Sequence, residues 1–258
     1  MRSKDYSNYH NERKPDIGDI NKYTDWQSDY AFNFHFNRRS NWGDCVVDFG
    51  GNIGAKTAKI LNVTVVEVDK SAQKILRQKK IKYKESLDEF EDDSIDTIYC
   101  SHVLEHLTNY HDYLDKFHEK LKKGGKLILV LPAENQSFEP NKEDVDSNGH
   151  LQTWTFKLIM TSLYNAGFKA IDWKMNMFSL PSLFNRMINI NKRMILFGSD
   201  TDSPALACTL RNIYYRMNDF KAVRFMKYMA FLLIRPITTF FPGWCGMELY
   251  VVAEKIGD

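Results

Sequence analysis

The chain has 258 residues, 43% of them hydrophobic and 14% aromatic, and its 35 basic and 33 acidic side chains give a formal net charge of +2. This hydrophobic content supports an ordinary buried core, and the length suits one α/β domain with an appended segment. The near balance of charge excludes a general attraction to nucleic acid, so no nucleic-acid partner is expected. The four cysteines lack C-x-x-C spacing and the N-terminus lacks the apolar segment of a secretory signal. Both features predict reduced thiols and a cytoplasmic location.

Residues 1–43 are predicted to form an N-terminal arm ahead of the main domain. The first twenty positions are polar, whereas residues 23–42 concentrate aromatic side chains, namely Trp26, Tyr30, Phe32, Phe34, Phe36 and Trp42. Two interpretations stay open. The arm is a helix or extended segment packed against the edge of a sheet, or it is a lid that closes over bound ligands.

The stretch from Asp44 to Lys70 predicts a strand, a glycine turn, a helix and a second strand. Cys45–Phe49 is short, apolar and β-branched, as expected of a strand buried on both faces of a parallel sheet. Ala55–Leu61 has helical spacing, and Val63–Val68 predicts the second strand, which ends beside Asp69. A carboxylate at that place in a nucleotide-binding βαβ unit accepts hydrogen bonds from ribose hydroxyls. We therefore expect Asp69 to bind a ribose.

The turn itself carries Gly50, Gly51 and Gly54, which remove side chains where the backbone bends and approaches a ligand. The dinucleotide fingerprint G-x-G-x-x-G, started at Gly50, requires glycines where Asn52 and Ala55 stand. A nicotinamide oxidoreductase is therefore disfavoured by the glycine spacing. Asparagine tolerates the left-handed backbone better than most residues, so Asn52 can preserve the shape of a glycine loop.

The remaining elements alternate between strand and helix, as in a parallel α/β sheet. They are a helix over Ser71–Lys79, a weak strand over Ile81–Tyr83, a strand over Ile95–Ser101, a helix over Tyr110–Leu121, a Gly-Gly turn within Lys122–Lys126, a strand over Leu127–Leu131, a helix within Gly149–Lys169 and a last strand over Glu248–Lys255. A polar loop, residues 133–150, follows the Leu127–Leu131 strand at the edge where open α/β sheets bind ligands.

The acidic run Glu89–Asp93 has loop-like spacing and no neighbouring histidine. It predicts a solvated turn, and no metal site is expected.

Several of these stretches resemble one family. Asp48 followed by Gly50, Asn52 and Gly54 resembles motif I of the class I S-adenosylmethionine-dependent methyltransferases, an acid and then G-x-G-x-G, from which Asn52 departs. Residues 93–107, DSIDTIYCSHVLEHL, resemble the fourth strand and following turn of the small-molecule branch, the methyltransferase type 11-like proteins. The family's fifth strand, next helix and closing strand are similar to Gly124–Pro132, Gly149–Lys169 and Glu248–Lys255. The resemblance covers residues 44–175 and 246–256.

This resemblance implies a fold and a domain division. The fold is α/β, a Rossmann-like, doubly wound and mostly parallel seven-stranded sheet with an antiparallel last strand. The chain then divides into the N-terminal arm or lid (1–43), the methyltransferase domain (44–175 and 246–258) and a helical insertion before the last strand (176–245).

The resemblance also implies S-adenosyl-L-methionine as the cofactor, bound where the first four strands end. The residues expected to bind it are Asp48, Gly50, Gly51, Asn52, Gly54, Asp69, Lys70, Ser86, Leu87, Ser101 and His102. The acid that contacts adenine in the family is not clearly aligned, and both Glu85 and Asp88 are alternatives.

Two histidines are the candidate catalytic residues. Methyl transfer from a sulfonium needs a positioned acceptor and often a base, and histidine suits an oxygen or nitrogen acceptor near neutral pH. His106 follows the fourth strand, and His150 ends the polar loop. Each has a structural alternative, because His106 can hydrogen-bond the loop backbone and His150 can start the next helix. No N-P-P-Y-like tetrapeptide follows the fourth strand, which disfavours amino-methylating nucleic-acid enzymes.

The insertion is basic on a chain that is otherwise balanced. From residue 175 to residue 244 it carries nine basic and three acidic side chains. Projection at 100° per residue places basic side chains on one side of residues 220–235 and apolar ones on the other. This helix either packs on the domain with its charges in water or lies on the inner face of a membrane as a peripheral contact.

The predicted function is S-adenosylmethionine-dependent methyl transfer to a small polar acceptor, anionic or lipid-linked. The preferred acceptor atom is an oxygen on a sugar, a phosphorylated sugar or a lipid-linked glycan precursor. Two alternatives stay open. The chain is a catalytically inactive scaffold that binds S-adenosylmethionine, or it is a methyltransferase that acts on a lipid or quinone.

Overall fold

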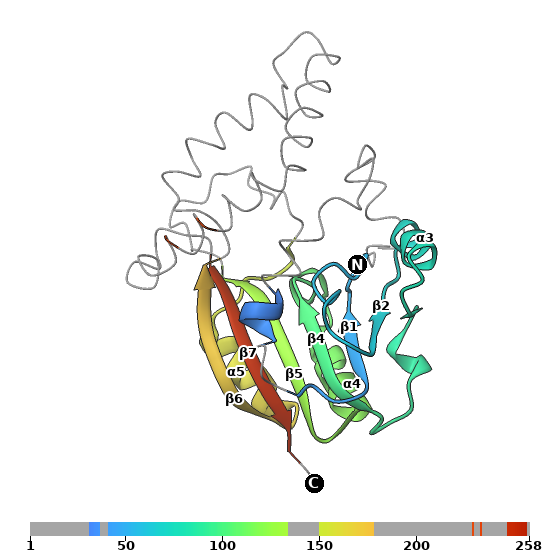
Figure 1. The fold of residues 1–258 in the computed structure, drawn as a ribbon. Helices are drawn as coiled ribbons and strands as arrows, with labels where there is room; N and C mark the ends of the chain where they lie inside the picture. Colours follow the sequence, from blue (N-terminus) through green and yellow to red (C-terminus); the bar gives the residue numbers. More distant parts are fainter. Residues whose placement is uncertain are drawn as a thin grey trace. The chain divides into compact units, whose positions relative to one another are not determined.

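The computed structural model describes residues 31–36, 41–133, 150–177, 229, 233 and 247–256 (Figure 1). Its centre is a seven-stranded sheet with the strand order β3-β2-β1-β4-β5-β7-β6. The strands are β1 (Val46–Phe49), β2 (Val63–Val66), β3 (Tyr83–Lys84), β4 (Ile95–Ser101), β5 (Leu121–Ala133), β6 (Phe168–Met177) and β7 (Met247–Lys255). The sheet is mostly parallel and β7 is antiparallel. The predicted fold class is therefore confirmed.

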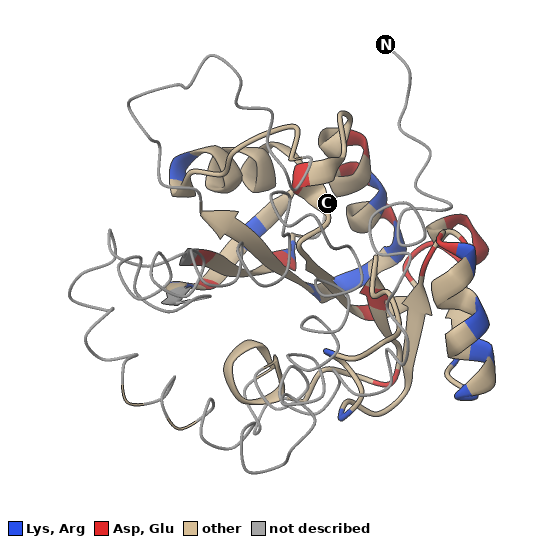
Figure 2. Ribbon diagram, turned by 90° about the horizontal axis from the view of Figure 1, so that it is seen from above, with Lys and Arg blue, Asp and Glu red and all other residues tan. Residues whose placement is uncertain are grey.

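Three α-helices accompany these strands, namely α3 (Lys70–Gln78), α4 (Tyr110–Lys120) and α5 (Phe156–Asn165), with short helical turns η2 (Ala31–His35), η3 (Leu87–Glu89) and η4 (Leu104–His106). Helices α4 and α5 lie on the same side of the sheet (Figure 2). In the same view the ribbon of α3, at the right, is blue in several places, because the helix contains Lys70, Lys74 and Arg77.

The register of the parallel strands brings their carboxyl ends to one edge. Val46–Phe49 pairs residue for residue with Val63–Val66 on one side and with Thr97–Cys100 on the other. Val66 in turn pairs with Lys84 of β3. The segments that leave β1, β2, β3 and β4 therefore start side by side, and this edge is where open α/β sheets bind ligands.

Both faces of the sheet are covered, as a parallel sheet requires. Along β5, Leu127, Leu129 and Leu131 face one layer and Ile128 and Val130 face the other. The first layer is completed by apolar side chains of the two helices, namely Leu114 and Phe117 of α4 and Ile159 and Leu163 of α5. All of these side chains are at most 1% exposed, so the hydrophobic core on this face is continuous.

The second layer is covered by the described part of the N-terminal arm. Ala31 and Phe36 are fully buried against Tyr99 of β4 and Tyr250 of β7. The Tyr250 hydroxyl donates to the carbonyl oxygen of His35 over 2.5 Å, and His35 Nδ1 lies 2.8 Å from the Tyr99 hydroxyl oxygen. Of the two interpretations of the arm, packing against the sheet edge is wrong for these residues, because they lie on the middle of a face. The lid interpretation stays open. The aromatic side chains that precede them lie outside the described residues.

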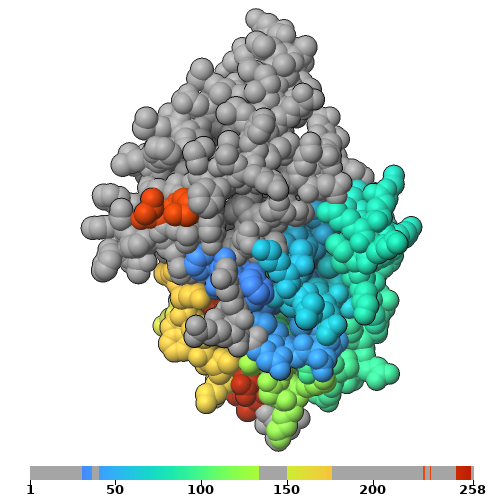
Figure 3. Space-filling view, in the orientation of Figure 1, coloured from blue at the N-terminus to red at the C-terminus, as the bar shows by residue number. Residues whose placement is uncertain are grey.

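The turn after β1 differs from its prediction. The predicted helix over Ala55–Leu61 is a series of turns, in which Gly54 N donates to Gly51 O and Ile60 N donates to Thr57 O. A helix of seven residues forms few hydrogen bonds against a costly nucleation step, and two of these seven are β-branched. Ile60 packs against the buried layer around Phe36, and the space-filling view shows the arm and this turn side by side (Figure 3).

Two strands also differ from the sequence prediction. The third strand is Tyr83–Lys84 instead of Ile81–Tyr83. The fifth begins at Leu121, ahead of the predicted Gly-Gly turn. Between its pairs Ile95↔Leu121 and Thr97↔Lys126 the register shifts, and Gly124 has a φ of 73°. The glycines therefore form an irregularity within a longer strand instead of a turn before it.

The chain divides into two compact units, one of Met1–Lys174 with Leu249–Asp258 and one of Met175–Glu248. The predicted insertion, with the helix expected over 220–235, lies outside the described residues apart from the last two residues of β6, Asn176 and Met177, and from Met229 and Leu233. Residues 1–30 of the arm and 134–149 of the polar loop also lie outside them. Within the part of the chain that is described, no helix has the length and apolar character needed to cross a membrane.

Candidate active site

The glycine loop after β1 has a backbone that most residues cannot adopt. Gly50, Asn52 and Gly54 have φ values of 66°, 52° and 71°, which lie in the left-handed region. A β-carbon on Gly50 would lie 2.4 Å from Val103 Cγ2, and one on Gly51 would lie 2.4 Å from Asp48 Cγ. The loop is therefore restricted to glycine at both positions, and Asn52 adopts the conformation that its side chain tolerates best among non-glycine residues.

Asp48 is buried directly beneath this loop. Its side chain is 2% exposed and accepts a hydrogen bond of 2.6 Å from the Thr57 hydroxyl. Burial raises the pKa of Asp48 to about 6, against the opposing effects of the Thr57 hydrogen bond and the nearby Lys56 ammonium. Asp48 thus lies against Gly51 of the loop and accepts a hydrogen bond from the turn that follows it.

Glu67, at the end of β2, is a residue that the sequence analysis missed. It is 8% exposed, its Oε2 accepts from Asn52 N over 2.8 Å, and its Oε1 accepts from Asp69 N over 2.8 Å. Burial raises the pKa of its carboxyl group. The signal was present in the sequence as a second acid two residues before Asp69, on the same face of an extended segment.

Asp69 has a structural task in addition to the predicted one. It is 1% exposed and caps α3, with Oδ1 accepting from Ser71 N over 2.8 Å and from Ala72 N over 2.9 Å. This is the usual bonding of an aspartate N-cap. The predicted ribose contact of Asp69 stays a prediction, and Glu67 stands beside it at the same strand end.

The predicted cofactor residues after β3 and at the start of α3 differ in burial and in their partners. Ser86 caps η3 and Leu87 is 1% exposed. Lys70, a predicted cofactor residue, directs its Nζ to Glu85 Oε1 at 2.8 Å, and both side chains are more than half exposed. Asp88, the other candidate for the adenine contact, pairs with Lys116 over 2.6 Å. Both acids proposed for the adenine therefore already have a lysine partner.

The end of β4 is tied to the loop and to its neighbour strand. Ser101 Oγ accepts from Lys56 Nζ over 2.7 Å. His102 has a φ of 56°, and its backbone N donates to Val130 O over 2.9 Å. The Nδ1 of His102 lies 3.4 Å from Glu105 Oε1. This geometry turns the chain sharply after β4 toward the candidate catalytic residues.

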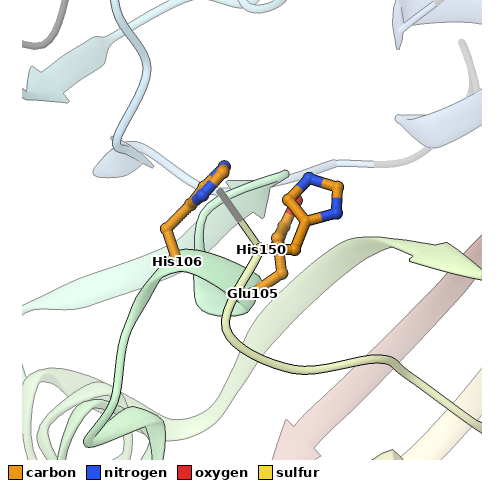
Figure 4. A group of neighbouring side chains, drawn as sticks. All are labelled: Glu105, His106 and His150. Carbon is orange, nitrogen blue, oxygen red and sulfur yellow. The ribbon is translucent and has the colours of Figure 1, made fainter. Parts of the chain in front are cut away.

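The two predicted catalytic histidines are brought together. The rings of His106 and His150, which are 44 positions apart in the sequence, have centroids 5.0 Å apart in an edge-to-face arrangement. The segment that carries His150 is fastened to η4, since Leu151 N donates to Glu105 O over 2.7 Å and the Gln152 side-chain amide donates to Leu104 O over 2.8 Å. The side chain of Glu105 lies with the two histidines (Figure 4).

Glu105 is the second residue that the sequence analysis missed. It is fully buried, and within the described residues neither carboxylate oxygen has a hydrogen bond. Its charge acts on Cys100. Burial, and then the charges of Glu105 and Asp48, hold the pKa of the Cys100 thiol well above its ordinary value. Only its place beside His106 in the sequence could have suggested a role.

The site fits a nucleoside cofactor with a positively charged sulfonium. The glycine loop presents bare backbone to the edge of the sheet, where an added β-carbon would clash. Buried carboxylates stand at the ends of β1 and β2. Together these features define a nucleotide-binding protein of the doubly wound α/β class.

The comparisons with known proteins identify the class more closely. A family model described as a methyltransferase domain matches residues 21–172, more than half of the chain. The chain therefore belongs to the methyltransferase domain family. It is a class I S-adenosylmethionine-dependent methyltransferase, and S-adenosylmethionine is its cofactor. A sequence comparison with curated proteins gave no match.

Solved structures share the fold at low sequence identity. The chain is similar to the structure of the Haloferax volcanii Trm112 methyltransferase activator with the putative methyltransferase, with TM-score 0.56 and 12% identity over 99% of this chain and 100% of that one. Haemonchus contortus phosphoethanolamine N-methyltransferase 2, with phosphomonomethylethanolamine and S-adenosylhomocysteine, matches with TM-score 0.55 and 14% identity over 99% and 61%. A putative methyltransferase from Bacillus halodurans matches with TM-score 0.53 and 12% identity over 89% and 99%. These identities support the fold alone.

Proposed function

We propose that this methyltransferase transfers its methyl group to an oxygen of a small polar acceptor, with a sugar, a phosphorylated sugar or a lipid-linked glycan precursor as the preferred class. The observation that carries the proposal is the meeting of His106 and His150, with ring centroids 5.0 Å apart, just beyond the end of β4. An acceptor hydroxyl must lose its proton on methylation, and groups that manage a proton are needed there.

The position of these histidines supports a role toward the acceptor. Val103 lies against Gly50 of the cofactor loop, and η4 with Glu105 and His106 follows at once in the chain. His106 therefore comes three residues after a residue that lies against the cofactor loop, and neither histidine is part of that loop. Glu105 is fully buried beside them, and a carboxylate there stabilises positive charge on a neighbouring group.

The preference for a sugar-like acceptor rests on the sequence. The segment after β4 is S-H-V-L-E-H-L, which resembles the small-molecule branch of the family, and the insertion of residues 176–245 carries an excess of basic side chains. An anionic group such as a phosphate suits such an excess. A lipid or quinone acceptor is the second candidate, which the apolar side of the predicted helix over 220–235 favours.

The test is a product assay against a panel of sugars, sugar phosphates and quinols. Production of S-adenosylhomocysteine identifies a substrate, and nuclear magnetic resonance of the product locates the methyl group. His106→Asn and His150→Asn should each lower kcat, by roughly 10²- to 10⁴-fold if the residue manages the proton alone. His111→Asn is the matched control, because His111 is exposed on α4.

A methyl group found on nitrogen or carbon would overturn the assignment of the acceptor atom. Full activity in both His106→Asn and His150→Asn would remove the role given to the pair. Normal S-adenosylhomocysteine binding by the variants establishes that a loss of activity arises at the acceptor side.

A further inference from the structure

We propose that Glu105, His106 and His150 bind a divalent transition-metal ion beside the acceptor. The presence of the ion is argued from these three residues alone, and the task given to it below rests on the proposed function. No metal site was expected from the sequence. The acidic run Glu89–Asp93 predicted a solvated turn, and the histidines were candidate bases.

The spacing of the donor atoms comes close to a coordination sphere. One donor from each of the three residues can be chosen so that all lie within 4.8 Å of one another. Donors that bind one ion tetrahedrally at about 2.0–2.2 Å are about 3.3–3.6 Å apart. Closing the site thus needs side-chain movements of up to about an ångström. The hydrogen bond from Leu151 N to Glu105 O holds the two contributing segments together.

The buried carboxylate favours a cation beside it. Glu105 is 0% exposed, and both of its oxygens lack a hydrogen bond to any residue that the structure describes. An ionised group in such a place is costly unless it is paired or coordinates a metal. Among the described residues, His102 Nδ1 lies 3.4 Å from Oε1. A divalent ion bound to Glu105 would neutralise its carboxylate.

The donor set selects the kind of ion. Two imidazoles and one carboxylate suit zinc, iron(II), cobalt(II) or manganese(II), whereas magnesium and calcium prefer oxygen ligands alone. Three protein ligands leave coordination positions open, as in sites where the ion acts on a substrate. Figure 4 shows the side chains of η4 and of residue 150 meeting in one place, from two separate segments.

The ion gives the proposed reaction its activated oxygen. As a Lewis acid it lowers the pKa of an acceptor hydroxyl, whose proton then passes to water. The oxygen forms a bond to the methyl carbon, and the carbon–sulfur bond of the sulfonium breaks with its electron pair remaining on sulfur. The negative oxygen and the positive sulfonium thus yield a neutral ether and a neutral thioether.

Titration with cobalt(II), followed by its absorption spectrum in the visible range, measures binding without any acceptor. We expect one cobalt per chain, displacement by zinc and no competition from an equal concentration of magnesium. Glu105→Gln and His150→Asn should each weaken binding by at least about tenfold, the loss usual even for a residue that only supports a metal ligand. The matched controls Glu119→Gln and His111→Asn replace exposed residues of α4 and should bind cobalt like the parent chain.

Absence of cobalt and zinc binding in the parent chain would overturn the proposal, and so would binding that is equal in all four variants. S-adenosylhomocysteine binding checks that each variant is folded. If Glu105→Gln does not fold, the cobalt affinity of His150→Asn alone tests the proposed site. The two proposals fail separately. A chain that methylates oxygen but binds no ion retains the proposed function, whereas a chain that binds cobalt through these residues but methylates another atom retains the metal site.

Discussion

At the scale of single residues, three of the buried carboxylates of the site differ in their surroundings. Asp48 lies in β1, Glu67 follows β2 and Glu105 follows β4, and they are 2%, 8% and 0% exposed. Each has a different environment, because Asp48 has a hydroxyl partner, Glu67 has two backbone donors and Glu105 has no side-chain hydrogen bond within the described part of the chain. Burying charge at one edge of the sheet disfavours the folded state, and a cationic ligand relieves this cost.

The pKa of Asp48 predicts a particular dependence of stability on pH. A carboxyl group whose pKa is about 6 when folded and about 3.9 when unfolded binds more protons in the folded state between these values. Its contribution to the free energy of unfolding therefore falls as pH rises from about 4 to 6, by about 3 kcal/mol in total. Asp48→Asn lacks this fall. Urea unfolding at a series of pH values should show the variant gaining on the parent chain as pH rises, and a constant difference between the two would contradict the assigned pKa.

Asp69 predicts a separation of two tasks. Asp69→Ala should destabilise the fold by about 1 kcal/mol through loss of the N-cap of α3, and it should weaken cofactor binding by about tenfold or more through loss of charge-assisted hydrogen bonds. A capping residue that is 1% exposed contributes to folding as well as to binding. Asp69→Asn is the control, because asparagine caps a helix equally well. It should restore stability while affinity, measured by calorimetry, stays low. Recovery of affinity in Asp69→Asn would show that charge at this position does not matter for the cofactor.

At the scale of elements, the glycine loop predicts a contrast between two glycines with similar backbones. Gly50 and Gly124 have φ values of 66° and 73°. A β-carbon at Gly50 would lie 2.4 Å from Val103, whereas one at Gly124 would have no neighbour nearer than 4.0 Å. Gly124→Ala should therefore cost only the backbone strain, about 1–2 kcal/mol, and leave cofactor affinity unchanged. Gly50→Ala should cost more and abolish binding, because it displaces Val103. Equal effects in thermal unfolding and in binding would refute this reading of the loop.

The elements that could be predicted from the sequence are the strands with continuous apolar runs, because such runs indicate strands buried on both faces. Leu127–Leu131 and Ile95–Ser101 are continuous apolar runs, and the structure has strands at both places. The turn of residues 55–61 has the spacing of a helix, so its irregularity could not be predicted from periodicity. The segment is short and contains two β-branched residues, which weakens a helix there. The start of β5 depends on pairing with Ile95, which local sequence does not encode.

The candidate site divides in the same way. The glycine loop is local, so its residues and the left-handed Asn52 could be predicted from sequence. Glu67 and Glu105 are defined by hydrogen bonds, burial and neighbours that arise only when separate strands meet. The proximity of His106 and His150 likewise needs the strand edge and the segment after the polar loop together. Their residue types were predictable, but their meeting was not.

At the scale of the whole molecule, the charge of the insertion predicts a salt-sensitive association with membranes. The second unit, Met175–Glu248, contains the predicted helix over 220–235, in which Met229 and Leu233 are 38% and 71% exposed. Basic side chains near an anionic lipid surface contribute about 1 kcal/mol each. We expect co-sedimentation with phosphatidylserine vesicles at low salt and release at high salt. A variant with Lys221, Arg224, Lys227 and Arg235 changed to Ser should stay in solution. If the parent chain also stays wholly in solution at low salt, the insertion acts on the acceptor alone.

The central claim is that the edge formed by the ends of β1–β4 binds S-adenosylmethionine, and one calorimetric measurement tests it most directly. The chain is titrated with S-adenosylhomocysteine and, separately, with NAD. We expect saturable binding of one S-adenosylhomocysteine per chain and none of NAD. At a hundredfold excess over its Kd, that ligand should also stabilise the fold by roughly 2.7 kcal/mol. Binding of NAD with none of S-adenosylhomocysteine would contradict the assignment of cofactor, loop and function together.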